Sequence, residues 1–96
     1  MDVTINGRRV TLREKLPAAD NWDMLAQFGQ TGEFDLRTMT FEQVTDLFRR
    51  FVESWEYDGD PASIDSYREL DLFKEYVPLM AAVSEQMKGI FGEGKN

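Results

Sequence analysis

Cysteine and histidine are both absent from this chain of 96 residues. Without thiol or imidazole groups the chain cannot form disulfide bonds, Ser-His or Cys-His catalytic pairs, or metal sites with thiolate or imidazole ligands. Gly89, Gly92 and Gly94 do not form a phosphate-binding loop, because no strand precedes them and no helix follows. Paired carboxylates would need a cleft that so small a domain rarely builds. We therefore expect no enzyme and no catalytic, cofactor or metal site.

Long apolar stretches are also missing from the sequence. No run approaches the ~20 residues that are needed to span a bilayer. Arg8 and Arg9 lie where the apolar core of a signal peptide would be. We expect a soluble, cytoplasmic protein that has no membrane partner.

Basic residues are scarce relative to acidic ones. Eleven Lys and Arg stand against 18 Asp and Glu, a net charge of −7, and most of the acidic residues fall within residues 18–76. Such a chain repels nucleic acids and anionic membranes, so basic protein surfaces are the better partners. Because 42% of the residues are hydrophobic and seven are Phe, we expect a single globular domain over residues 1–96.

The first 15 residues have the pattern of a β-hairpin. The apolar residues Val3, Ile5, Val10 and Leu12 alternate with polar ones on both sides of Asn6-Gly7. Asn-Gly favours a type I′ turn, in which both central residues have positive φ. The pattern predicts strands over residues 2–5 and 8–13. Their apolar face must pack on helices, because an isolated hairpin is only marginally stable.

Residues 18–91 are predicted to be the helical part of the domain. Apolar residues spaced three apart in residues 18–28, followed by Gly29, predict a short helix. Residues 30–38 are expected to form a loop with Phe34 and Leu36 directed inward.

The strongest helical pattern begins at Thr40, which has the spacing of a capping box with Gln43. Seven apolar residues then recur at intervals of three and four: Phe41, Val44, Leu47, Phe48, Phe51, Val52 and Trp55. This stripe predicts a four-turn amphipathic helix that extends to Trp55.

A further helix is predicted after an acidic turn at residues 58–61. Ser66 and Glu69 have the spacing of a second capping box, with Leu70, Phe73 and Val77 on the buried side. Pro78 must kink or restart this helix.

A last apolar stripe follows Pro78, before a flexible tail at residues 92–96. Its members are Leu79, Met80, Val83, Met87, Ile90 and Phe91. The predicted fold class is therefore mostly α, a small domain of three to four helices with an N-terminal β-hairpin.

Four side chains are candidates for binding a partner protein: Trp22, Trp55, Met80 and Met87. Trp22 is the best of them because it lies on a short helix beside loops. Trp55 ends an apolar stripe, for which packing in the core is the simpler interpretation. The two flexible methionines fit an irregular core or an adaptable binding face equally well.

Residues 48–76 carry a resemblance to a known family. An amphipathic helix runs into Phe51-Val-Glu-Ser-Trp55, an acidic turn ends at Pro61, Ser66-Tyr67 and Leu70 follow, and an apolar helix comes after Pro78. This order resembles the tail assembly chaperones of long-tailed, non-contractile (siphovirus-type) bacteriophages, over about the last two-thirds of the chain.

The resemblance implies a chaperone of virion morphogenesis. Its partners would be the tape measure protein and the major tail protein, whose subunits it recruits to the tail tube, with a homo-oligomer as a further possibility. It would act in the host cell cytoplasm and be absent from the mature virion. In this family a −1 ribosomal frameshift near the end of the short protein commonly makes a longer product, and the codons of Glu93-Gly94-Lys95 could carry one.

Another class of protein also fits the composition. An acidic inhibitor or DNA mimic would occupy a basic surface with carboxylates spaced like phosphates. We rank it second, because the acidic residues fall in turns and at helix starts, where capping explains them. A small enzyme ranks third.

Overall fold

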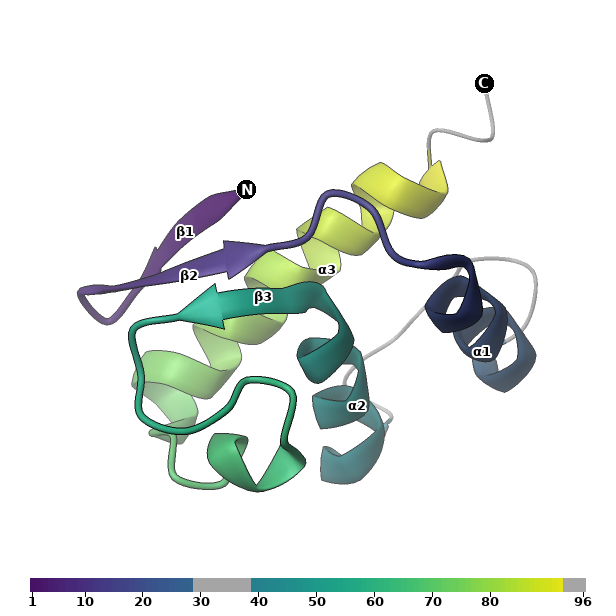
Figure 1. Cartoon of the computed structure of the whole chain (residues 1–96). Coiled ribbons are helices and arrows are strands. Elements are labelled where there is room, and N and C mark those ends of the chain that lie inside the picture. The colour runs from purple at the N-terminus through teal and green to yellow at the C-terminus, as the bar shows by residue number, and fades with distance from the viewer. Residues whose placement is uncertain (29–38, 93–96) are drawn as a thin grey trace.

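A three-stranded antiparallel sheet and three α-helices make up the computed structural model, which describes residues 1–28 and 39–92 (Figure 1). The strands are β1 (Asp2–Ile5), β2 (Arg8–Leu12) and β3 (Val52–Trp55). The α-helices are α1 (Ala18–Phe28), α2 (Phe41–Phe51) and α3 (Val77–Gly92). A short 3₁₀-helix, η2 (Ile64–Tyr67), and a π-helical turn, η3 (Leu72–Tyr76), connect β3 to α3.

The predicted mostly α fold class is wrong, because the sheet has a third strand and the domain is α+β. The sheet order is β1-β2-β3. The predicted four-turn helix ends at Phe51, and the next four residues pair with β2, so that Trp55 lies opposite Val10. This pairing gives β2 hydrogen-bond partners on both sides, which the hairpin alone cannot supply. The sequence suggested a continuing helix because Trp55 follows Val52 by three positions, a spacing that fits an amphipathic helix even though the chain changes to a strand at Val52.

The local predictions for the hairpin, for the helix over residues 18–28 and for the start of α2 are confirmed. Asn6 and Gly7 have φ values of 49° and 79°, as a type I′ turn requires. The helix predicted over residues 18–28 is α1. At the start of α2, the Gln43 backbone N–H donates to Thr40 Oγ1 at 3.2 Å, and the Thr40 N–H donates to Gln43 Oε1 at 2.9 Å.

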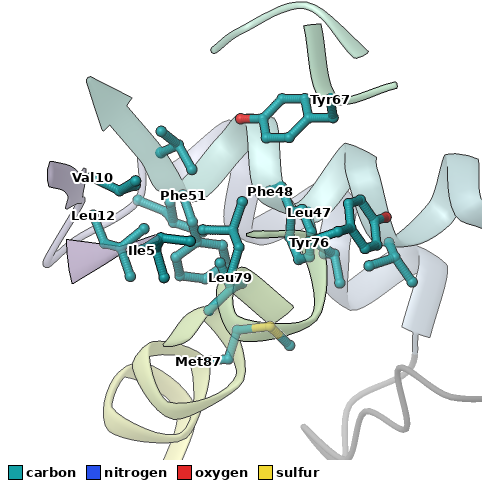
Figure 2. Close-up of a cluster of buried hydrophobic side chains, with 14 of the residues drawn as sticks. Ile5, Val10, Leu12, Leu47, Phe48, Phe51, Tyr67, Tyr76, Leu79 and Met87 are labelled. Carbon is teal, nitrogen blue, oxygen red and sulfur yellow. The ribbon is translucent and has the colours of Figure 1, made fainter. Parts of the chain in front are cut away.

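The core lies between the sheet, α2 and α3. Val10, Leu47, Phe48, Phe51 and Val83 are 0% exposed. Figure 2 shows that side chains from the strands and from both helices converge on one cluster. In Figure 1, α3 crosses behind the sheet. The opposite face of the sheet carries exposed polar side chains, so the sheet is covered on one side only.

Arg50 ties α1 to α2. Its guanidinium lies 2.6 Å from Asp20 and 3.4 Å from Asp23 on α1, and 3.0 Å from Asp46 on its own helix. The side chain of Arg50 is only 12% exposed. Ion pairs of a partly buried arginine that contacts several carboxylates stabilise a fold more than an isolated ion pair on the surface does.

The second predicted capping box is wrong. Ser66 lies within η2, and the helix begins instead at Asp71, whose carboxylate accepts the N–H groups of Phe73 (3.1 Å) and Lys74 (2.8 Å). Two i→i+5 hydrogen bonds follow, from Tyr76 N–H to Asp71 O at 2.9 Å and from the Val77 N–H to Leu72 O. The turn is therefore π-helical and continues directly into α3.

Phe73 and Val77 were predicted to face inward and are exposed instead. The buried side of α3 carries Tyr76, Leu79 and Val83. On an α-helix the residues three and four positions before Tyr76 would share this side. These residues are Phe73 and Leu72, and the wider π turn rotates both away from the core. The predicted loop with Phe34 and Leu36, and residues 93–96 of the predicted tail, lie outside the described residues.

Candidate protein-interaction surface

The four predicted partner-binding residues do not come together on one surface. Met87 is 3% exposed in the core, and Met80 is half-buried against it. Trp55 is also half-buried. Trp22 alone of the four is exposed, at 75%.

Trp55 holds the acidic turn in place. Its indole N–H donates to Gly59 O at 3.0 Å, and its ring centroid lies 4.7 Å from that of Tyr67. The hydroxyl of Tyr67 donates to Pro61 O at 2.7 Å. Two aromatic side chains therefore satisfy carbonyl groups of the turn, which gives Trp55 a structural role.

Trp22 lies in an apolar row on α1. Ala18 and Ala26, four positions before and after it, are exposed as well. Residues four apart share a helix face. Met24 is 0% exposed on the same helix, and it fixes the side that faces the core. Trp22 is thus displayed on the outer side of α1.

A second exposed apolar surface lies at the start of α3. Leu72, Phe73 and Val77 are 54%, 78% and 42% exposed. Val77 follows Leu72 by five positions and Phe73 by four, so in a π turn it lies one turn above both. We call these three residues the η3 surface. The sequence feature that marks this segment is Asp71, a helix cap followed by Glu75 and, two residues into α3, by a proline.

The buried side of η3 keeps the η3 surface turned outward. Tyr76 is 5% exposed, and its hydroxyl lies 2.8 Å from Oγ1 of Thr45, which is 0% exposed. The ring of Tyr76 stacks on Phe41, with centroids 5.3 Å apart, and lies 5.0 Å from that of Phe48. This packing leaves the three apolar side chains no place in the core.

The segment that leads from β3 to the η3 surface is acidic. Residues 53–75 contain eight Asp and Glu against Arg68 and Lys74, a net charge of −6. Glu69 and Asp71 are exposed next to it in sequence. The apolar residues thus have both acidic neighbours and the basic Lys74 in the sequence.

A polar cavity of about 210 Å³ adjoins η3, and Arg8, Tyr57, Glu69 and Glu75 are among its lining residues. The Arg8 guanidinium lies 4.8 Å from the centroid of the Tyr57 ring. The Asp71 N–H donates to Glu75 at 2.7 Å, which is the main reason that the pKa of Glu75 is below its ordinary value. Burial, together with the nearby Glu75 carboxylate, raises the pKa of Tyr57 to about 12.

Hydrogen bonds fix the positions of Tyr57 and Glu75 in the cavity wall. The Tyr57 hydroxyl donates to Ile5 O at 2.7 Å, and Asn6 Nδ2 donates to Glu75 at 3.3 Å. Glu75 thus accepts two hydrogen bonds, and Tyr57 keeps its proton at neutral pH. This arrangement joins the hairpin to η3, which is a structural task.

Among residues 1–28 and 39–92, no group of three or more Asp and Glu is placed to hold a metal ion. In the same part of the chain, no helix has the length and apolar character to cross a membrane.

Comparison of this chain with models of protein families, with curated proteins and with solved structures found no match.

Proposed function

We propose that this protein is a non-enzymatic chaperone that binds an apolar segment of another protein through the η3 surface. The observation that carries the proposal is that Leu72, Phe73 and Val77 are exposed together while Tyr76 fixes the same turn to the core. Clustered apolar side chains on a rigid surface are typical of sites for other proteins. Their burial by a partner would be favourable by about 25 cal/mol per Å² of apolar area, before the costs of association.

In its more specific form, the proposal is a tail assembly chaperone that binds the tape measure protein and recruits the major tail protein. This form depends on the sequence resemblance of residues 48–76. The resemblance predicted a helix that runs into Trp55, whereas residues 52–55 form a strand and Ser66 lies in a 3₁₀-helix. The apolar helix that it predicted near Pro78 corresponds to α3. Trp22 on α1, at the other end of the molecule in Figure 1 from the start of α3, offers a second surface for a second partner.

The test is a titration of the protein with a helical segment of a phage tape measure protein, by isothermal calorimetry. Phe73→Ser should weaken binding about tenfold or more, since an exposed aromatic at the centre of a contact contributes ~1–2 kcal/mol or more. Trp22→Ser is the matched control, because it removes an equally exposed aromatic from the other surface. Unchanged affinity of the Phe73→Ser variant would refute binding at the η3 surface.

An acidic inhibitor or DNA mimic is the second candidate, and the charge of −6 in residues 53–75 favours it. A mimic needs free carboxylates, whereas Asp60, Asp71 and Glu75 each accept a backbone N–H. For a mimic, binding should collapse at high salt and be unaffected by Phe73→Ser. The same titration at two salt concentrations therefore separates the two candidates.

A further inference from the structure

The tip of the hairpin carries an Asn-Gly pair, Asn6-Gly7, and both residues are exposed. The side-chain carboxamide of an asparagine can be attacked by the backbone nitrogen of the next residue, which closes a five-membered succinimide ring. Glycine in the next position favours this attack, because it has no Cβ atom to hinder the nitrogen. A Cβ atom added at Gly7 would meet nothing within 4 Å, so no neighbouring group shields the turn on that side.

The hydrogen bonds of the hairpin leave the attacking nitrogen outside the ladder. Ile5 pairs with Arg8 across the turn. In a two-residue type I′ turn the closing hydrogen bond joins these two flanking residues, and the N–H of the second central residue takes no part in it. The Gly7 nitrogen is therefore a nucleophile that the ladder does not engage.

Two features keep the carboxamide of Asn6 away from this nitrogen while the turn is closed. Ring closure requires the Asn6 Cβ and the Gly7 nitrogen to eclipse each other about the Cα–C bond, whereas the left-handed conformation of Asn6 in the turn, with φ of 49°, keeps them apart. The Asn6 Nδ2 also donates to Glu75 at 3.3 Å. The reaction therefore needs a local opening of the turn, and its rate follows the population of the open turn.

We propose that Asn6 is a deamidation site of this protein and that its contact with Glu75 controls how fast it reacts. The Gly7 nitrogen forms a bond to Cγ of Asn6, the bond from Cγ to Nδ2 breaks, and the Nδ2 group leaves as ammonia with the proton of the Gly7 N–H. Water then opens the succinimide at either of its two carbonyl carbons. The products are aspartate and isoaspartate, and the reaction consumes water alone.

Either product breaks the link between the hairpin and η3. A carboxylate replaces the N–H donor that faced Glu75, and Glu75 is itself ionised at neutral pH, since the hydrogen bond from the Asp71 N–H holds its pKa below the ordinary value. Two like charges at this distance repel each other. Arg8, whose guanidinium lies over the Tyr57 ring in the same cavity wall, offsets part of the repulsion. The expected result is a weaker contact between hairpin and η3 in an otherwise folded domain.

Peptide mapping by mass spectrometry tests the reaction in the full chain, incubated at neutral pH and physiological temperature. The readout is the gain in mass when OH replaces NH₂, with aspartate and isoaspartate separated by chromatography. Asn21 is the internal control, because it is half-buried within α1 and followed by the bulky Trp22. We expect both products at Asn6, none at Asn21, and faster conversion of Asn6 in the chain unfolded by urea.

Two variants test the control by Glu75. Glu75→Ala should speed deamidation of Asn6 about twofold to fivefold, the effect of one lost hydrogen bond on the opening of the turn. Glu69→Ala is the matched control, because it removes another carboxylate from the same cavity wall and leaves the acceptor of the Asn6 bond in place. It should leave the rate unchanged.

A substitution that imitates the aspartate product tests the consequence. Asn6→Asp should lower the melting temperature by about 2–6 °C, as expected for a repulsive exposed pair in a domain of this size. The fall should be smaller in a Glu75→Gln background, where the opposing charge is absent.

The possible results decide the two parts of the inference. Conversion of Asn6 that is no faster than that of Asn21 would overturn the assignment of the site. Equal rates in the wild type and in Glu75→Ala would overturn the control by Glu75, as would equal rates in the folded and the urea-unfolded chain. None of these results depends on whether the η3 surface binds a partner, so the inference stands or falls separately from the proposed function.

Discussion

The hydrogen bond between Thr45 and Tyr76 is the contact whose removal tests most directly how η3 is held. Both groups are buried, with exposures of 0% and 5%, and their oxygen atoms lie 2.8 Å apart. Tyr76→Phe keeps the aromatic ring that stacks on Phe41 and removes the hydroxyl. The Thr45 hydroxyl then stays in the core without this partner, which costs about 1–3 kcal/mol of unfolding free energy.

The double substitution is expected to be milder than the sum of the two single ones. Thr45→Val alone strands the Tyr76 hydroxyl in the same way, at a similar cost of about 1–3 kcal/mol. When both hydroxyls are removed, neither polar group is left buried without a partner, and the remaining contact is apolar. We therefore expect a coupling free energy of about 1 kcal/mol or more in a double-mutant cycle.

Urea denaturation monitored by circular dichroism measures all four proteins of the cycle. A loss of 1 kcal/mol corresponds to a lower melting temperature of about 4–8 °C in a domain of this size. Tyr76→Val serves as the control for ring packing, because it removes the stacking on Phe41 as well and should destabilise further. Strictly additive effects of Thr45→Val and Tyr76→Phe would refute the assigned hydrogen bond.

Two further predictions concern the hairpin turn and alkaline pH. Gly7→Val should destabilise the fold by about 1–3 kcal/mol through backbone strain alone, because φ is 79° and a Cβ atom there meets nothing within 4 Å. Thermal melting measures the loss, and Gly7→Asn is the control because asparagine tolerates positive φ. An unchanged melting temperature in Gly7→Val would contradict the prediction. Stability should also fall as pH rises above about 10, where tyrosines ionise in the unfolded chain. The pKa of Tyr57 is raised to about 12, and burial also raises that of Tyr67, so their contribution is complete below pH 10 and is lost as pH rises through the folded values. The fall in melting temperature between pH 8 and pH 11 should be smaller in Tyr57→Phe than in the wild type, because Tyr67 still contributes to it. A wild-type protein equally stable at both pH values would rule out the effect.

The elements that the sequence predicted well are those whose cause is local. The type I′ turn depends on Asn6 and Gly7 alone, since they tolerate positive φ. The start of α2 depends on Thr40 and Gln43, which are three residues apart and bond to each other's backbone. Neither feature requires contact with a distant part of the chain.

The candidate surface was largely missed because its exposure depends on a distant contact. Trp22, which was predicted as a partner-binding residue, is exposed. Phe73 was placed in the core because a spacing of three to four residues suits a buried helix face. The spacing of apolar residues does not predict a π turn. The segment Leu72–Tyr76 forms one, and the Tyr76 hydroxyl bonds there to Thr45, which lies 31 residues earlier.

Sequence alone determined a small acidic domain without Cys or His, its tight hairpin turn and the amphipathic start of α2. Composition and neighbouring residues are sufficient for each of these. Tertiary structure decided where α2 ends and which way η3 faces. Val52–Trp55 leave the helix because β2, some 40 residues earlier, offers an open edge whose backbone groups need partners. Leu72, Phe73 and Val77 remain outside because Tyr76 occupies the inward side of the turn.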